Sequence, residues 1–217
     1  ERTAWVWRTV LRRHTLEQVR GFLDMMNVRF LVARADQVPG GVAVLPQQGP
    51  DQIRAIERTS AWPRAFVVDG VEQHPDLATF AERLRQAPAP FASVQSDDGA
   101  AVDEVAALPR SASAVSAAYD YLLTTNTTTF RVQTAAPGLA VLSEAHVDRD
   151  FRATLNGASV PYIRVNHALK GVGIPGAGTW TVKFEYRPRL WTWTWLLSGL
   201  GLTFLIATRL LAGPLLK

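Results

Sequence analysis

Cysteine is absent from this 217-residue sequence. Its absence excludes disulfide frameworks, zinc sites built on thiolates, cysteine nucleophiles and thiol redox chemistry. The sequence also lacks the phosphate-binding P-loop, the dinucleotide-binding glycine pattern, the paired-histidine signature of zinc proteases, the EF-hand loop and the serine elbow of α/β-hydrolases. Nucleotide-binding, zinc-protease and calcium-loop functions therefore have no support from motifs.

Blocks of like charge are also absent. The 23 Lys and Arg residues exceed the 19 Asp and Glu residues by a net charge of +4, but they are scattered along the chain. Nucleic acid is therefore not an expected partner. A hydrophobic content of 47% lies in the ordinary globular range, which excludes collagen-like and disordered classes and fits one or two modest domains.

Charged side chains are missing from residues 190–208, whereas charges occur throughout the chain before this run. A helix of about 19 residues spans roughly 28 Å, close to the hydrocarbon thickness of a bilayer. Trp191, Trp193 and Trp195 cluster at its start, and indole rings favour the headgroup region of a membrane. We expect a transmembrane helix over residues 190–208, with these three tryptophans at the membrane interface.

Positive residues flank this run on both sides, so charge alone does not orient it. Arg187 and Arg189 precede it, and Arg209 and Lys217 follow it. Because the tryptophans alternate, the competing interpretation is a last β-strand followed by an apolar helix packed on a protein core. We expect residues 209–217 to form a short cytoplasmic tail.

The region at residues 1–95 shows both helix and strand periodicity. The predicted elements are amphipathic helices at residues 15–27 and 76–86, the first with a capping box at Thr15 and Gln18, and strands at residues 28–34, 42–46 and 64–74. Residues 96–112 are weakly patterned and predict a surface connection. The first region is therefore expected to be a small α/β layer.

Short strand-like runs then repeat through residues 113–187, a spacing typical of an antiparallel β-sandwich. Asn156 and Gly157 separate two of these runs, and both residue types tolerate the positive φ that a tight hairpin requires. The predicted fold class is α+β: a small α/β layer, then a jelly-roll-like antiparallel β-sandwich, then one C-terminal transmembrane helix.

The most suggestive polar cluster is the run HVDRD at residues 146–150. On an extended strand His146, Asp148 and Asp150 share one face, and such a trio can bind a divalent metal ion. The competing interpretation, which we favour, is a solvated strand end or loop. A hydrolase built on Ser143, His146 and Asp148 is a weaker alternative, because three members so close along one strand rarely reach triad geometry. We predict no metal site and no catalytic residue.

Aromatic side chains of the second region allow two interpretations, a sugar-binding face or a sandwich core. They are Phe130, Phe151, Tyr162, Trp180, Phe184 and Tyr186. Phe130 and Phe184 alternate with apolar partners, which favours the core, while Tyr162 and Tyr186 stay open between the two.

Several stretches together resemble the C-terminal region of the YfhO-type bacterial membrane proteins. They are MMNVRFLVAR, PRAFVVDGVEQHPD, the run from TTFRVQTAAPG to TWTVKFEYRP and the final hydrophobic helix, and they cover roughly residues 15–210. Residues 139–188 carry the most specific part of the pattern. Members of that family look like polytopic glycosyltransferases of the GT-C type, which transfer sugar from a polyprenyl-phosphate carrier to an envelope polymer or lipid.

The resemblance implies an extracytoplasmic, membrane-tethered module at a bacterial cell membrane, with Lys217 on the cytoplasmic side. Because the catalytic acid of such enzymes lies in an early extracytoplasmic loop, this chain is expected to be a non-catalytic fragment without a cofactor. Its expected partners, through the parent protein, are the membrane, the polyprenyl-phosphate sugar and an envelope glycan or lipid. The candidate acceptor-binding residues are His146, Asp148, Arg149, Asp150, Arg152, Tyr162, Arg164 and Asn166. The alternative function is a non-enzymatic, single-pass envelope β-sandwich that binds glycan or a protein partner.

Overall fold

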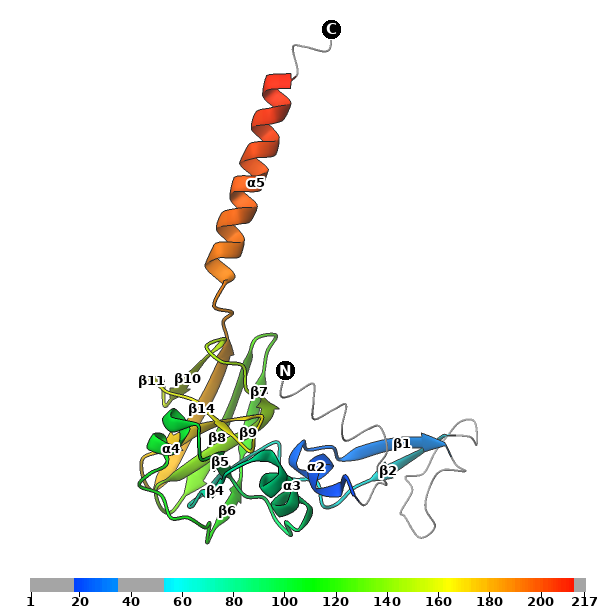
Figure 1. The fold of residues 1–217 in the computed structure, drawn as a ribbon, viewed down its shortest axis with the longest axis vertical. Helices are drawn as coiled ribbons and strands as arrows, with labels where there is room; N and C mark the ends of the chain where they lie inside the picture. The colour runs from blue at the N-terminus through cyan, green and yellow to red at the C-terminus, as the bar shows by residue number, and fades with distance from the viewer. Residues whose placement is uncertain (1–17, 35–52, 213–217) are drawn as a thin grey trace.

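The computed structural model describes residues 18–34 and 53–212. The predicted cap at Thr15 and the predicted strand at residues 42–46 lie outside these ranges. In the described part, the predicted α+β class is confirmed: two five-stranded antiparallel sheets and short helices precede one long apolar C-terminal helix (Figure 1).

The two large sheets form the sandwich. One has the strand order β11-β10-β14-β8-β7 and the other β12-β13-β9-β3-β6, and all neighbouring strands within them are antiparallel. The strands are β3 (Ala65–Val68), β6 (Val115–Ala117), β7 (Tyr119–Leu123), β8 (Thr127–Thr134), β9 (Gly138–Ala145), β10 (Phe151–Leu155), β11 (Ala158–Val160), β12 (Ile163–Val165), β13 (Leu169–Ile174) and β14 (Gly178–Tyr186).

The core between these sheets is built from alternate residues of their strands, with Phe130 and Phe184 at its centre. Because both side chains are buried, Phe130 and Phe184 belong to the sandwich core and not to a sugar-binding face. The hairpin between β10 and β11 is also confirmed, since Asn156 and Gly157 have φ values of 49° and 84°.

A third layer covers the outer face of the β9-containing sheet. It consists of α3 (Leu77–Arg85), α4 (Gly99–Glu104), α2 (Arg20–Met25) and the parallel pair β4 (Glu72–His74) and β5 (Ser93–Gln95). Strand β3 is buried on both faces: Ala65 and Val67 enter the core between the sheets, while Phe66 and Val68 enter the core beneath the helices. Such two-sided burial explains its continuous apolar sequence.

Strand β3 comes from the segment before the predicted connection, yet it lies between β9 and β6 in the sandwich. The predicted single strand at residues 64–74 is two strands, β3 and β4, and helix α4 lies inside the predicted connection at residues 96–112. The sandwich is therefore completed by sequence from the first region.

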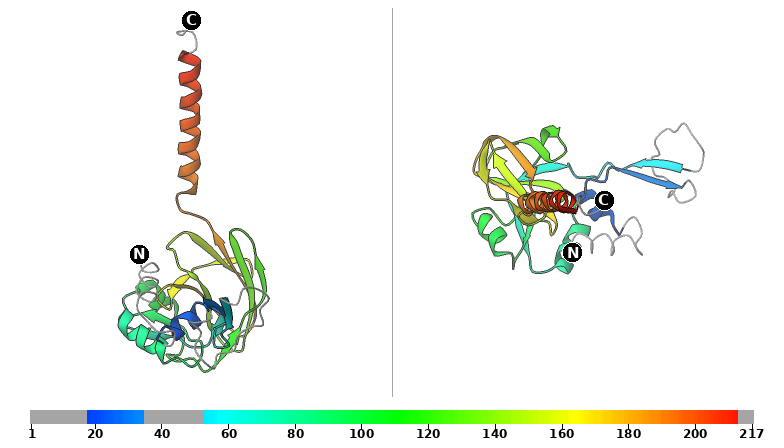
Figure 2. Two further views of the ribbon diagram at one scale, coloured as in Figure 1. Left: turned by 90° about the vertical axis from the view of Figure 1, so that its right-hand side faces the viewer. Right: turned by 90° about the horizontal axis from the view of Figure 1, so that it is seen from above.

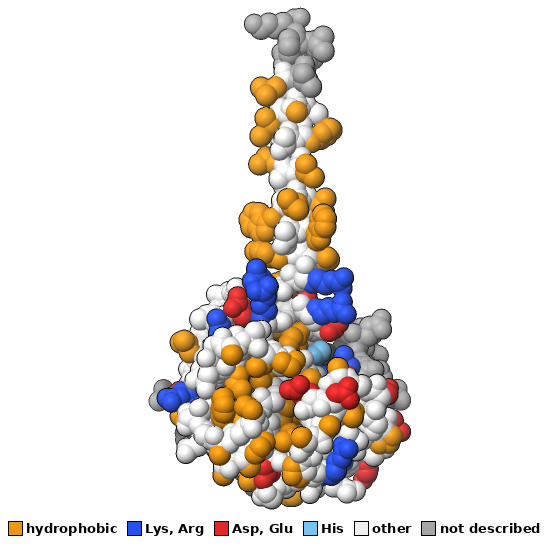
Figure 3. All heavy atoms as spheres, turned by 90° about the vertical axis from the view of Figure 1, so that its left-hand side faces the viewer, with side chains coloured by type: hydrophobic (Ala, Val, Ile, Leu, Met, Phe, Trp, Pro, Cys, Tyr) orange, Lys and Arg blue, Asp and Glu red, His pale blue; other side chains and the backbone are white. Residues whose placement is uncertain are grey.

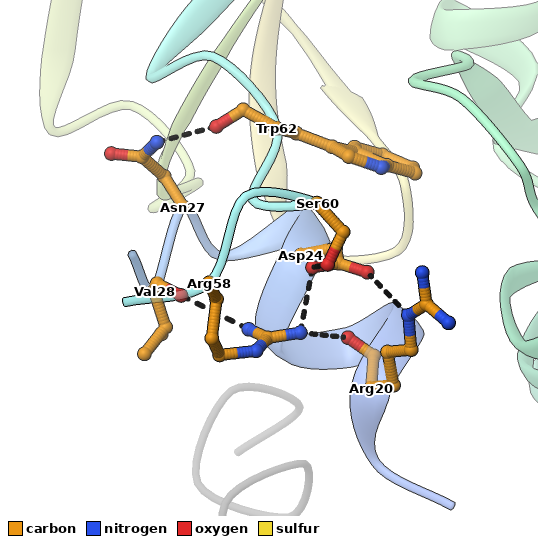
Figure 4. Close-up of polar contacts among 7 residues, drawn as sticks. All are labelled: Arg20, Asp24, Asn27, Val28, Arg58, Ser60 and Trp62. Atoms are coloured by element: carbon orange, nitrogen blue, oxygen red, sulfur yellow. Dashed lines mark hydrogen bonds and ion pairs between the residues drawn. The ribbon is translucent and has the colours of Figure 1, made fainter. Parts of the chain in front are cut away.

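A two-stranded ribbon, β1 (Phe30–Arg34) and β2 (Ile53–Glu57), extends sideways from α2 (Figures 1 and 2). The buried carboxylate of Asp24 fastens α2 to the chain that follows the ribbon: it accepts hydrogen bonds from Arg58 at 2.6 Å and Ser60 at 2.8 Å, with Arg20 at 3.7 Å (Figure 4). The amide of Asn27 donates to the carbonyl of Trp62 in the same cluster.

Helix α5 (Trp191–Ala212) leaves the end of β14 and points away from the sandwich (Figures 1 and 2). Its stretch Trp191–Leu210 is long and apolar enough to cross a membrane, and none of it is buried. The alternative of a strand followed by a core helix is therefore wrong, because the tryptophans are helical and residues 18–34 and 53–212 form no core around the helix.

Candidate functional site

The candidate site lies where α5 leaves the sandwich, which we call the helix-proximal end. Strands β9 and β14 end there, and β8 and β10 begin there, because β10 and β8 both run antiparallel to β14. The loop at residues 146–150 joins β9 to β10 at this end. The topology thus places the predicted HVDRD cluster beside the start of the apolar helix.

Hydrogen bonds fasten this loop to the linker before α5. The backbone N–H of Arg187 donates to the carbonyl of Asp150 at 2.7 Å, and the backbone N–H of Arg189 donates to the Asp150 carboxylate at 3.0 Å. Asp148 and Arg149 are exposed at the tip and form an ion pair at 3.4 Å. Arg149 has a φ of 62°, so the loop reverses at this residue.

His146 and Tyr162 meet beneath the loop, with ring centroids 5.2 Å apart. The Tyr162 hydroxyl donates to the carbonyl of Val147 at 2.7 Å and accepts from the backbone N–H of Phe151 at 3.3 Å. Burial raises the pKa of Tyr162 above its usual value. The tyrosine hydroxyl therefore braces both sides of the loop, and its ring packs against Phe184 of the core.

The imidazole of His146 is half-buried, and its Nδ1 has no hydrogen-bond partner among the residues that the structure describes. Burial lowers the pKa of His146, and the positive charges of Arg164 and Lys170 act in the same direction. The carboxylates of Asp148 and Asp98 oppose this shift without reversing it. The neutral imidazole is the favoured form at neutral pH.

Two other predicted residues, Arg152 and Arg164, lie just outside this loop. Arg152 is exposed on β10, opposite Glu185 of β14 in the strand register. Arg164 forms an ion pair with Asp98 at 3.4 Å and so ties β12 to the start of α4. His146 and Tyr162 lie together beneath the loop, and the charge of Arg164 also acts on His146.

Asn166 is completely buried, which corrects its prediction as a contact residue. Its side-chain oxygen accepts from the backbone N–H of Ser93 at 2.8 Å, and its amide donates to the carbonyl of Phe91 at 2.9 Å. Both ends of the amide are thus used to hold the chain that enters β5. We assign Asn166 a structural role.

The catalytic alternatives are not supported by the geometry. The hydroxyl of Ser143 donates to the carbonyl of Met25 at 3.0 Å, so it points to α2 and not toward His146. Across the residues that the structure describes, no group of three His, Asp or Glu side chains could hold a metal ion. The carboxylate of Asp150 is engaged by the linker backbone.

A buried charge cluster behind the loop was missed by sequence reasoning. Lys170 of β13 is fully buried, with its Nζ 2.9 Å from the Glu144 carboxylate and 3.5 Å from the ring centroid of Phe151. Glu144 also accepts from Thr128 at 2.9 Å and from Arg64 at 2.8 Å. A single lysine inside the apolar strand sequence LKGVGI was the available signal.

Burial opposes the charged form of both partners. It lowers the pKa of Lys170, although the hydrogen bond and charge of Glu144 act the other way. Burial alone would raise the pKa of Glu144, but the hydrogen bond and charge of Lys170, with the bonds from Thr128 and Arg64, outweigh it and lower the pKa. The pair is therefore held ionised by mutual contact.

The three tryptophans predicted at a membrane interface, Trp191, Trp193 and Trp195, are exposed in the first turns of α5, next to the sandwich. The rings of Trp191 and Trp195 contact each other edge to face, with centroids 5.9 Å apart. Their interfacial role stays a prediction.

Comparison with protein-family models, with curated proteins and with solved structures finds no match for this chain. The resemblance to YfhO-type proteins therefore stays a prediction.

Replacing Asp150 by alanine should loosen the linker without unfolding the sandwich. The change removes one hydrogen bond to the Arg189 amide, worth about 1 kcal/mol. We expect hydrogen exchange of that amide to become about fivefold faster. Asp150→Asn keeps an acceptor oxygen and should exchange like the wild type; equal rates in all three chains would contradict the assigned bond.

The His146 imidazole should titrate below the ordinary histidine pKa of about 6.5. Because its folded pKa is depressed, its contribution to stability is present above the unfolded pKa and is lost as pH falls through the folded pKa. Imidazole proton NMR shifts measure this pKa directly. Arg164→Gln should raise it, and a wild-type value at or above the ordinary one would contradict the burial argument.

Proposed function

We propose that this chain is the extracytoplasmic, membrane-tethered C-terminal module of a YfhO-like polytopic membrane protein. In this proposal the module assists glycosyl transfer from a polyprenyl-phosphate sugar to a cell-envelope acceptor and does not itself catalyse the reaction. One observation carries the proposal: the exposed loop at residues 146–150 is hydrogen-bonded to the linker that enters an exposed, apolar helix.

The position of the loop near the start of α5 suits it to contact an acceptor at the membrane surface. If α5 crosses a bilayer, the four-residue linker at residues 187–190 keeps the helix-proximal end close to the headgroups. A sugar on a polyprenyl-phosphate carrier is presented at the same depth. The exposed Asp148 and Arg149 offer an acceptor and a donor for hydroxyl groups of an acceptor glycan.

The braced geometry beneath the loop supports a positioning role. The Tyr162 hydroxyl and the Asp150 carboxylate hold the loop from two sides, so its tip needs little reordering when it binds. The chemical step is assigned to a separate part of the parent protein.

The test is a loop variant, Asp148→Asn with Arg149→Gln, made in the intact parent protein. Loss of the two charged contacts should raise the KM for the acceptor about tenfold and leave kcat unchanged. Arg110→Gln, an exposed arginine far from the loop in the sequence, is the matched control. Wild-type kinetics in the loop variant would contradict the proposal.

The intact gene distinguishes this function from the single-pass alternative. Several upstream hydrophobic spans with an acidic residue in the first outside loop would support a transferase module. A signal peptide directly before Glu1, with no further spans, would contradict it and favour an envelope β-sandwich that binds glycan or a protein partner.

A further inference from the structure

Exposed apolar side chains gather at the helix-proximal end of the sandwich. Strand β7 is an edge strand, and all its residues are exposed. Leu122 and Leu123 are 63% and 52% exposed and pair with the start of β8. Val147 in the loop and Tyr186 at the end of β14 are also exposed. Apolar side chains from three parts of the chain thus share one end.

Hydrogen bonds join the segments that carry these side chains. The backbone N–H of Tyr186 donates to the carbonyl of Asn126 in the turn that follows β7, at 2.7 Å. The loop at residues 146–150 is bonded to the linker that follows Tyr186. The edge strand, the loop and the linker are therefore held together around the start of α5.

Unpaired positive charge surrounds the same end. Arg152, Arg187 and Arg189 are exposed and form no ion pair with any carboxylate in the described part of the chain. Arg149 pairs with the exposed Asp148, a contact that solvent weakens. Figure 3 shows basic side chains where the apolar helix meets the sandwich.

We propose that the helix-proximal end docks on the anionic phospholipid headgroups of the leaflet that α5 enters. Arg152, Arg187 and Arg189 contact lipid phosphates, and Leu122 and Leu123 enter the interfacial layer. A bilayer is the occupant that the helix itself brings to this surface, and basic residues next to a membrane helix are attracted to anionic lipids. This inference rests on the membrane insertion of α5 in the proposed function.

The absence of cysteine makes the test direct, because single cysteines can carry a nitroxide label. Leu123→Cys reports the docking surface. Ala177→Cys is the matched control, since Ala177 is exposed in the turn before β14, at the opposite end of the sandwich. The full chain is placed in nanodiscs of phosphatidylcholine, alone or with roughly one-third phosphatidylglycerol.

Collision with a water-soluble nickel complex measures exposure of each label. We expect the label at residue 123 to lose about threefold in nickel accessibility in the anionic discs, whereas the label at residue 177 stays unchanged. Adding Arg187→Gln and Arg189→Gln should restore the neutral-disc value at residue 123. Arg110→Gln, which removes a positive charge elsewhere on the surface, should not restore that value.

Two results would overturn the inference. Equal accessibility at residue 123 in both lipids, whether the label is exposed or shielded, shows that headgroup charge does not hold this surface. Accessibility at residue 123 that does not change when Arg187→Gln and Arg189→Gln are added also shows that headgroup charge does not hold this surface. A chain that does not enter the discs contradicts the proposed function as well, so the two failures are distinguishable.

Discussion

Lys170→Ala is expected to lower the free energy of unfolding by about 3–5 kcal/mol, because it removes one partner of a buried ion pair. Lys170 is fully buried, and its Nζ lies 2.9 Å from the Glu144 carboxylate and 3.5 Å from the Phe151 ring centroid. The alanine variant loses the charge, the ring contact and the packing of the side-chain stem.

Lys170→Met is the matched control for this change. Methionine fills the space of the lysine stem and keeps the contact with Phe151, while Thr128 and Arg64 still bond Glu144. We expect less than half of the loss seen with alanine. Denaturant titration of the full chain in detergent micelles measures both variants, and an alanine variant within about 1 kcal/mol of the wild type would contradict the buried pair.

Arginine at Leu200 and Phe204 should release the 217-residue chain from membranes. The two positions lie near the middle of α5 and one helical turn apart. Each arginine at the centre of a membrane helix costs about 2.5–3.5 kcal/mol, so the pair costs roughly 5–7 kcal/mol.

Alkaline extraction of membranes provides the measurement. Wild-type chain should stay with the membrane pellet, and the double-arginine variant should move to the soluble fraction. Alanine at the same two positions keeps the helix uncharged and should stay in the pellet. A double-arginine chain that stays in the pellet as fully as the alanine control would show that α5 is not what holds the chain there.

Local signals in the sequence predicted local structure well. The hairpin at Asn156 and Gly157 was predictable because the turn requires positive φ at both residues, and asparagine and glycine are the residue types that tolerate it best. Helix α3 was predictable from the helical spacing of its apolar residues, and the structure shows that Asp76 caps it by accepting from the backbone N–H of Thr79 at 2.8 Å. Neither feature depends on distant parts of the chain.

Long-range pairing could not be predicted from local patterns. Strand β3 inserts between β9 and β6, which lie far along the chain on the same sheet. The apolar sequence of β3 is compatible with any fully buried strand. The predicted connection at residues 96–112 was therefore expected to separate two regions, although strands from both sides of it share one sheet.

Only some contacts of the candidate site could be predicted, because several of them join residues on different strands. His146 and Tyr162 were both singled out, and the structure brings their rings together. Asn166 was misjudged because its positive φ of 46° in the turn after β12 turns the side chain into the core, where it bonds Ser93. Lys170 was overlooked because the partner that stabilises its charge lies on a neighbouring strand.

The depth of α5 in a bilayer tests the central claim most directly. A nitroxide at Gly201→Cys, in the middle of the exposed apolar helix, can be probed in nanodiscs by collision with oxygen, which concentrates in the bilayer, and with a nickel complex, which stays in water. The account predicts high oxygen and negligible nickel accessibility at this position. High nickel accessibility at residue 201 would contradict a membrane-tethered sandwich.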